Sequence, residues 1–174
     1  MIPFAEYCAR VQAYLEDAYG MTVVTRDIPD PLTGDLDGQT IHIDYLLDAE
    51  ERLFLLAHLF GHTAQWNLSP EGHALGQPQQ PPVEAGLLQE LIAYEDEAAA
   101  YALAMLHRVG IVDLDQWFSN YAACDIAYLS HYYVTGEKGH FKNFWKDDVP
   151  KLAPRPVPPF TPARRPPRAD GIVI

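Results

Sequence analysis

The sequence predicts an α+β fold that is mainly α-helical, with a small β-sheet near the N-terminus and a proline-rich arm at the C-terminus. Apolar residues recur at helical spacing over most of the chain, whereas two short stretches before residue 46 are β-branched or alternate in polarity. After residue 149, proline becomes too frequent for a helix or a central strand. With 174 residues, of which 48% are hydrophobic, the chain suits one buried core. We therefore expect one domain, residues 1–149, followed by an arm, residues 150–174.

The N-terminal part is expected to form one helix and two strands. Residues 3–19 carry apolar side chains at helical spacing until Gly20. Residues 21–28 have β-branched strand character, and residues 39–45 alternate isoleucine with polar side chains that include Asp44. We expect these strands to pair in a small antiparallel sheet. Its polar face is expected to be solvated; the alternative is that Asp44 accepts a hydrogen bond from a metal-binding histidine.

The next segment, residues 50–66, predicts a helix that carries two histidines one turn apart. Asp48 is a good N-cap for this helix. His58 and His62 stand at i and i+4 in an apolar run, so their rings leave the same helix face and can converge on one metal ion. Gly61 allows another backbone to approach beside them. The alternative is a pair of hydrogen-bonded core histidines.

Residues 67–82 are rich in Pro, Gly and Gln and predict a long surface loop that could cover the site, from which Glu71 or His73 could enter it. Residues 83–109 then give the longest helical pattern of the chain. Glu95 lies one turn before a run of alanines and belongs near the inward face of this helix, whereas Glu97 belongs to an adjacent face. A carboxylate on an apolar face needs a partner, and a metal, an arginine or a histidine can supply it.

The C-terminal half of the domain predicts two further helices. Asp113 is expected to cap the first, and the second runs from about Asp125 to Val134 and ends at Gly136. A short final helix is expected within residues 140–149. The tyrosines of the second helix indicate core or a partner surface rather than catalysis.

The arm differs from the body in charge as well as in proline content. The net charge is −12, yet five of the 12 basic residues follow Pro150, where Asp170 is the single acidic residue. We expect a polyproline II arm that lies against protein, either its own body or a second copy in a homo-oligomer, through three arginines and through Phe160 and the terminal Ile-Val-Ile. The arginines are Arg164, Arg165 and Arg168.

Two blocks of the sequence resemble a known family. The segment LFLLAHLFGH is similar to the HExGH helix of the ImmA/IrrE family of zincin-like metallopeptidases, regulators that cleave repressors in phage-related elements and stress responses. The segment YEDEAAAYALAML resembles the second family block, which supplies the third zinc ligand. The resemblance implies a zincin-like fold and a zinc site of His58, His62 and Glu95, with Glu97 as the alternative third ligand.

The chain departs from the family at one position. In HExxH proteins the glutamate after the first histidine deprotonates the zinc-bound water, and here that position is Leu59. Leucine cannot accept a proton, so the family's peptidase mechanism cannot run as written. We therefore expect a non-proteolytic regulatory or binding protein that retains a metal site. The alternative is an active zinc-dependent hydrolase whose base is another carboxylate, with four candidates: Glu97, Glu90, Glu71 and Asp44.

The composition predicts the class of binding partner and the cellular compartment. The acidic body repels phosphate backbones, so we expect a protein or peptide partner and no direct nucleic-acid binding. The sequence contains no run of about 18 apolar residues and no signal-peptide pattern in MIPFAEYCAR, which predicts a cytoplasmic protein that does not enter the membrane. Cys8 and Cys124 lack CxxC spacing and are expected to be reduced core residues.

Overall fold

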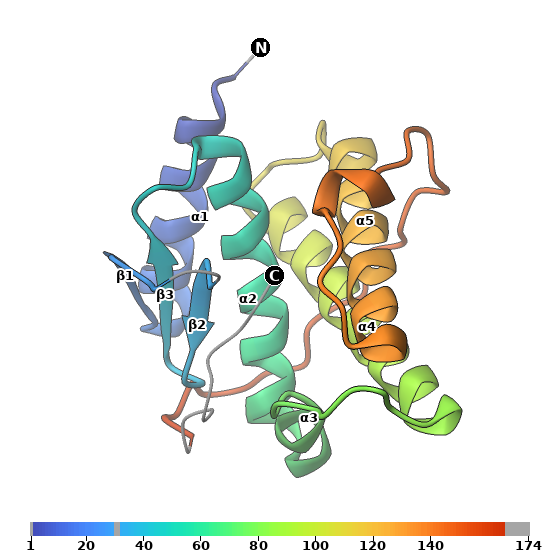
Figure 1. The fold of residues 1–174 in the computed structure, drawn as a ribbon. Coiled ribbons are helices and arrows are strands. Elements are labelled where there is room, and N and C mark those ends of the chain that lie inside the picture. Colours follow the sequence, from blue (N-terminus) through green and yellow to red (C-terminus); the bar gives the residue numbers. More distant parts are fainter. Residues whose placement is uncertain (1, 30–31, 166–174) are drawn as a thin grey trace.

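The computed structural model describes residues 2–29 and 32–165, and its fold is α+β and mainly helical, as predicted. Figure 1 shows the helices and strands in place. In chain order they are α1 (Phe4–Tyr19), β1 (Thr22–Arg26), β2 (Gly34–Leu36), β3 (Thr40–Asp44), α2 (Ala49–Leu68), α3 (Pro70–Leu75), α4 (Ala85–Arg108), α5 (Asp115–Thr135) and the short 3-10 helix η1 (Phe141–Phe144).

The small sheet is mixed, with strand order β1-β3-β2. The two predicted strands do pair, but the expected antiparallel arrangement is wrong, because β1 runs parallel to β3 with Val23 opposite Ile41. The connection between them contains a third strand, β2, beyond the two that the sequence predicts. The Asp37 carboxylate accepts hydrogen bonds from the N–H groups of Gln39 and Thr40 and fixes a tight reversal, so β2 is the antiparallel partner of β3. The chain reverses once between β1 and β2 and again between β2 and β3, so β1 and β3 run in the same direction.

Helix α2 lies at the centre of the molecule, between α1 with the sheet on one side and α4 with α5 on the other (Figure 1). The predicted cap is confirmed: the Asp48 side chain accepts from the Glu51 N–H at 2.9 Å, and the Glu51 carboxylate accepts from the Asp48 N–H at 3.3 Å. Every residue from Leu53 to Trp66 is buried. A helix that is buried on all faces is a core helix, and polar groups on it therefore need partners inside the protein.

Helices α2 and α4 approach each other closely at Gly61, as the sequence predicts. A Cβ atom on Gly61 would collide with the carbonyl oxygen of Ala98 and lie 2.8 Å from its carbonyl carbon. Glycine is therefore required on α2 at this level, and alanine faces it on α4. Since Ala98 follows Glu95 by one turn, the close contact also brings Glu95 to the level of His62.

Two predictions about the connections are wrong. The expected loop 67–82 contains helix α3, which Ser69 caps by accepting from the Gly72 N–H at 2.9 Å and which Pro70 opens at its first position. The two helices expected after Gly110 are one, α5, since no glycine or proline interrupts residues 115–135. Asp113 does not cap this helix, because its carboxylate accepts a hydrogen bond from the Tyr7 hydroxyl.

The described part of the arm, residues 150–165, lies along its own domain. The Arg155 N–H donates to the Ala100 carbonyl at 3.1 Å, and the Phe160 ring stacks on Tyr19 with centroids 4.9 Å apart. Arg164 pairs with Asp37 at 3.2 Å, and Arg165 donates to Asn67 at 3.1 Å. Arg168 and the terminal Ile-Val-Ile lie outside the described residues. Cys8 and Cys124 are both free and buried, as predicted.

Candidate metal centre

Two histidines on consecutive turns of α2 point at one spot. His58 is 3% exposed and His62 is 2% exposed, and their Nε2 atoms lie 3.0 Å apart. The two rings are nearly perpendicular, with centroids 4.4 Å apart. The i, i+4 spacing on a helix produces this convergence, because residues four apart stand above each other on one face.

Glu95 on α4 reaches the same spot. Its Oε2 atom lies 3.0 Å from His62 Nε2 and 3.6 Å from His58 Nε2, and the residue is 7% exposed. His58, His62 and Glu95 thus offer three converging ligand atoms in a buried position, a group that can hold a metal ion. We call these three residues the histidine–glutamate cluster.

Gln65 fixes the tautomer of His62. The Gln65 side-chain N–H₂ donates to the Tyr94 carbonyl at 2.8 Å and to the Glu97 carboxylate at 3.2 Å, so its oxygen must face the other way. That oxygen lies 2.9 Å from His62 Nδ1 and accepts its proton. His62 Nε2 therefore presents a lone pair to the cluster in the neutral imidazole, which is the orientation that a metal ligand requires.

Acceptor atoms consequently face one another inside the cluster. The lone pair of His62 Nε2 meets the Glu95 carboxylate at 3.0 Å, a contact that is repulsive unless a proton or a cation lies between them. Aromatic rings hold both imidazoles: Phe54 stacks on His58 with centroids 5.5 Å apart, and Tyr94 stacks on His62 at 4.6 Å. The donor set, two nitrogens and one carboxylate oxygen, fits a borderline divalent cation such as zinc.

A fourth side chain, which the sequence interpretation missed, lies beside the cluster. Asp125 on α5 is 1% exposed, and its Oδ2 atom lies 3.8 Å from His58 Nε2. Burial, and to a lesser degree the charge of Glu95, raise the pKa of the Asp125 carboxyl well above its ordinary value. The interpretation treated Asp125 as the start of a helix, where aspartate is common. The test applied to Glu95, a carboxylate among apolar residues of one helix, would have found it.

The other candidate carboxylates are placed elsewhere. Glu97 pairs with Arg155 and accepts from Gln65, so it stands behind His62 rather than in the cluster. The Asp44 carboxylate accepts from the N–H groups of Ile28 and Leu46, both at 2.8 Å, and serves the end of β3. Glu71 on α3 and Glu90 on α4 are exposed to solvent.

Leu59, at the position of the family's glutamate, belongs to the core. It is 0% exposed, and a Cβ atom built on Gly34 of β2 would lie 3.0 Å from its Cδ1 atom. The Leu59 side chain therefore packs under the edge strand of the sheet. It offers no proton acceptor beside the cluster.

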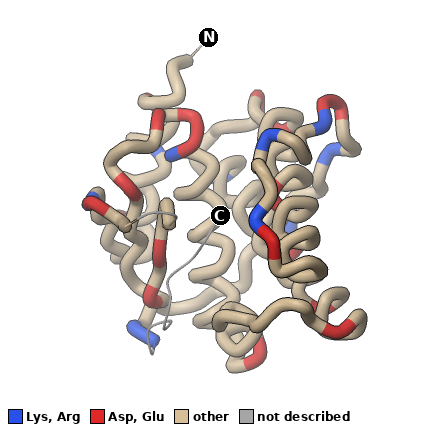
Figure 2. Tube along the Cα trace, in the orientation of Figure 1, with Lys and Arg blue, Asp and Glu red and all other residues tan. Residues whose placement is uncertain are grey.

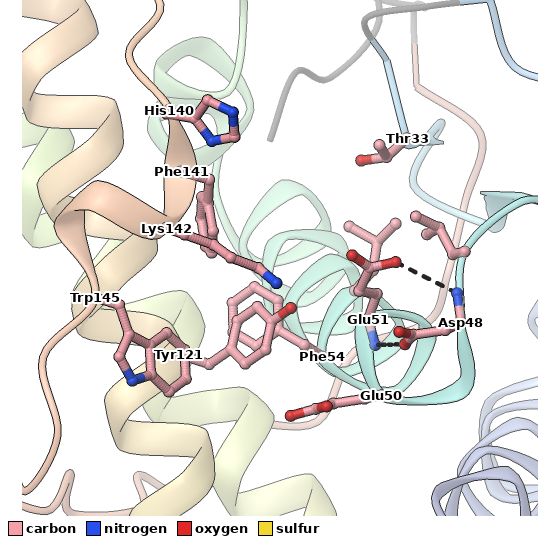
Figure 3. A pocket seen from close by; sticks show the side chains of 12 residues that line it. Thr33, Asp48, Glu50, Glu51, Phe54, Tyr121, His140, Phe141, Lys142 and Trp145 are labelled. Atoms are coloured by element: carbon pink, nitrogen blue, oxygen red, sulfur yellow. Dashed lines mark hydrogen bonds between the residues drawn. The ribbon is translucent and has the colours of Figure 1, made fainter.

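A cavity of about 620 Å³ opens at the N-terminal end of α2, one helix turn from the cluster. Glu50 and Glu51 line one wall, Lys142 and Trp145 line the other, and the Phe54 and Tyr121 rings form the floor between them (Figure 3). Since Phe54 also stacks on His58, this ring separates the cavity from the cluster. The cluster residues do not line the cavity.

Comparisons with known proteins give a limited result. No protein-family model and no curated protein matches the chain. Among solved structures, a Mycobacterium tuberculosis transcriptional regulator is similar at 14% identity and a TM-score of 0.33, over 79% of this chain and 44% of that one. The chain thus spans less than half of that regulator's length, and a likeness this weak carries no argument. The resemblance to the ImmA/IrrE family stays a prediction.

None of the helices in residues 2–29 and 32–165 is both long enough and apolar enough to cross a bilayer. This agrees with the expectation from the sequence that these segments do not span a membrane.

Proposed function

We propose that this chain is a zincin-like metal-binding protein that holds zinc through His58, His62 and Glu95 and acts as a non-proteolytic regulatory or binding module. The observation that carries the proposal is the convergence of three buried ligand atoms, with His62 Nε2 turned toward Glu95 by Gln65. Zinc is favoured over magnesium or calcium because two of the three ligand atoms are imidazole nitrogens. When bound, the ion would supply a fixed positive charge in an otherwise dry core.

The proposed lack of peptidase activity is supported by the positions of the side chains first considered as general bases. Leu59 is packed against β2, and each of the four alternative carboxylates considered above is engaged or exposed away from the cluster. A general base must come within hydrogen-bond reach of the proton that it removes. None of the residues first considered as the general base of a hydrolase is therefore placed to fill that role.

We propose that the binding partner of this chain is a protein or a peptide. Acidic residues outnumber basic ones by 24 to 12 and are spread over the elements of the domain (Figure 2). Such a surface repels nucleic-acid backbones at physiological salt and favours basic or neutral partners. The arm is a second expected contact region, either within the chain or between copies.

Metal analysis tests the proposed metal site. Protein purified without chelator or nickel is expected to contain about one zinc per chain, and His62→Ala and Glu95→Gln are expected to lose it. His140→Ala is the matched control, because His140 lies in the wall of the separate cavity and should leave the zinc content unchanged. Wild-type protein that takes up no divalent metal would refute the site.

A peptidase assay tests the other half of the proposal. Zinc-loaded wild type is expected to leave unfolded casein intact over hours at 37 °C. Cleavage that a chelator stops, and that zinc restores, would replace the non-proteolytic function with the hydrolase alternative.

A further inference from the structure

Asp125 on α5 is a buried carboxylate that lacks the usual hydrogen-bond partners among the described residues. Neither Oδ1 nor Oδ2 has a hydrogen-bond partner among the residues that the structure describes, and the side chain is 1% exposed. A carboxylate buried in this way is strongly destabilising unless a cation or a set of donors compensates it. The buried carboxylate of Asp44, by contrast, accepts two backbone N–H groups.

The direction of approach distinguishes Asp125 from a supporting residue. A carboxylate that merely orients a metal-binding histidine accepts a hydrogen bond from the ring nitrogen that does not bind the metal. Gln65 does this behind His62, at Nδ1. Asp125 instead comes within 3.8 Å of His58 Nε2, the nitrogen that also faces His62 and Glu95. It therefore lies on the metal side of the ring.

We propose that Asp125 is the fourth protein ligand, so that the histidine–glutamate cluster and Asp125 form a closed zinc site. This inference rests on the proposed function. Ligand atoms around a tetrahedral zinc ion at about 2.0–2.2 Å lie roughly 3.3–3.6 Å apart. The three separations within the cluster are 3.0, 3.0 and 3.6 Å, and Asp125 Oδ2 lies 3.8 Å from His58 Nε2. Asp125 does not come within 4.8 Å of all three cluster ligand atoms, so its side chain has to turn toward the ion when the ion binds.

Charge balance gives the second reason. Two neutral imidazoles, Glu95 and Asp125 together carry a charge of −2, which neutralises a divalent ion in the dry core. With Glu95 alone the buried site would keep a net positive charge, and such a charge is costly in an apolar surrounding. The same ion removes the cost of the buried Asp125 carboxylate.

A closed site implies a structural role for the metal. Its ligands come from α2, α4 and α5, so the ion joins three helices that are far apart in the sequence. Structural zinc sites have four protein ligands, whereas catalytic sites keep one position open. The metal would then control whether α5, which also forms one side of the 620 Å³ cavity through Tyr121, stays docked on α2.

The test compares Asp125→Asn with Asp44→Asn, a matched buried carboxylate away from the cluster. Zinc affinity is measured by competition with a chromogenic chelator, and thermal unfolding is measured with and without zinc. Asp125→Asn is expected to bind zinc at least about tenfold more weakly and to lose most of the zinc-dependent rise in Tm, while its metal-free form is at least as stable as wild type. Asp44→Asn is expected to lower the Tm of the metal-free form and leave zinc affinity unchanged.

Cobalt substitution tests closure directly, because Co²⁺ absorption responds to an added ligand. Azide should leave the visible spectrum of Co²⁺ wild type unchanged and should alter that of Asp125→Ala, in which a position is free. Equal zinc affinity of wild type and Asp125→Asn, or an azide response in wild type, would overturn the fourth ligand while leaving the three-ligand site intact. Wild type that binds neither zinc nor cobalt would overturn both proposals.

Discussion

Gln65 shows how a single residue outside the cluster can set its chemistry. The amide is held by the Tyr94 carbonyl and Glu97, and it leaves the His62 Nε2 lone pair facing Glu95. Gln65→Leu keeps the volume and removes the acceptor for the Nδ1 proton. We expect zinc affinity to fall about 10- to 100-fold, measured by chelator competition. Gln12→Leu, at a half-buried position of α1, is the control, and an equal loss in both variants would contradict the orienting role.

Leu59 is the residue at which the chain departs from the HExxH pattern, and Leu59→Glu restores that pattern. The new carboxylate would be buried under β2 without a partner, so we expect the free energy of unfolding to fall by roughly 3–5 kcal/mol in urea titration. Leu59→Met, which keeps the apolar volume, should cost less than about 1.5 kcal/mol.

Casein cleavage gives the second measurement on Leu59→Glu. With a closed site we expect no cleavage by the folded, zinc-loaded variant. Chelator-sensitive cleavage by Leu59→Glu, with none by wild type, would instead indicate a peptidase that lost its activity through one side chain.

The sequence made part of this site predictable and left part of it hidden. His58 and His62 could be paired because helical spacing alone puts them on one face, and Glu95 because it lies on the apolar face of its helix. The test that selects Glu95 was not applied to Asp125, and it does not select Gln65, which carries no charge. Their roles depend on contacts between α2, α4 and α5, and a side chain's tertiary neighbours are not encoded in the periodicity of its own helix.

At the scale of elements, the packing of α2 on α4 determines whether Glu95 reaches His62. Gly61→Ala places a methyl group against the Ala98 carbonyl and forces the two helices apart. We expect the free energy of unfolding to fall by about 1–3 kcal/mol and zinc affinity to fall with it, since the third ligand moves away. Gly86→Ala on α4 is the matched control, because a Cβ atom there meets no atom within 4 Å. That variant should be neutral or slightly more stable.

The elements themselves were predicted unevenly, for physical reasons. Helix α2 was clear because its cap, its apolar run and its length agree with one another. The parallel pairing of β1 with β3 was missed because register and direction depend on β2, a three-residue strand whose sequence also suits a turn. The continuity of α5 was missed because Asp125, an internal residue beside the histidine–glutamate cluster, has the same identity as a common helix cap.

For the molecule as a whole, the arm links the surface to the cluster. Arg155 in the arm pairs with Glu97, Glu97 accepts from Gln65, and Gln65 accepts from His62. An exposed ion pair contributes little by itself, about 0–1 kcal/mol. Through this series of contacts, a shift of the arm can nevertheless change the orientation of His62, one of the proposed zinc ligands.

Deletion of the arm after Pro150 is expected to lower the stability of the domain. Leu152, Val157 and Phe160 pack partly buried against the core, and Phe160 stacks on Tyr19. Half-burial of three such side chains contributes about 2–4 kcal/mol, so the truncated chain should unfold several degrees lower in calorimetry. Because these contacts lie within one chain, we expect the truncated chain to keep the oligomeric state of the wild type, measured by light scattering. Phe160→Ala should reproduce part of the Tm decrease, whereas Lys151→Ala, at an exposed position, should not. A truncated protein with unchanged Tm would show that the arm is not part of the folded domain, and one that dissociates from a wild-type oligomer would place these contacts between copies.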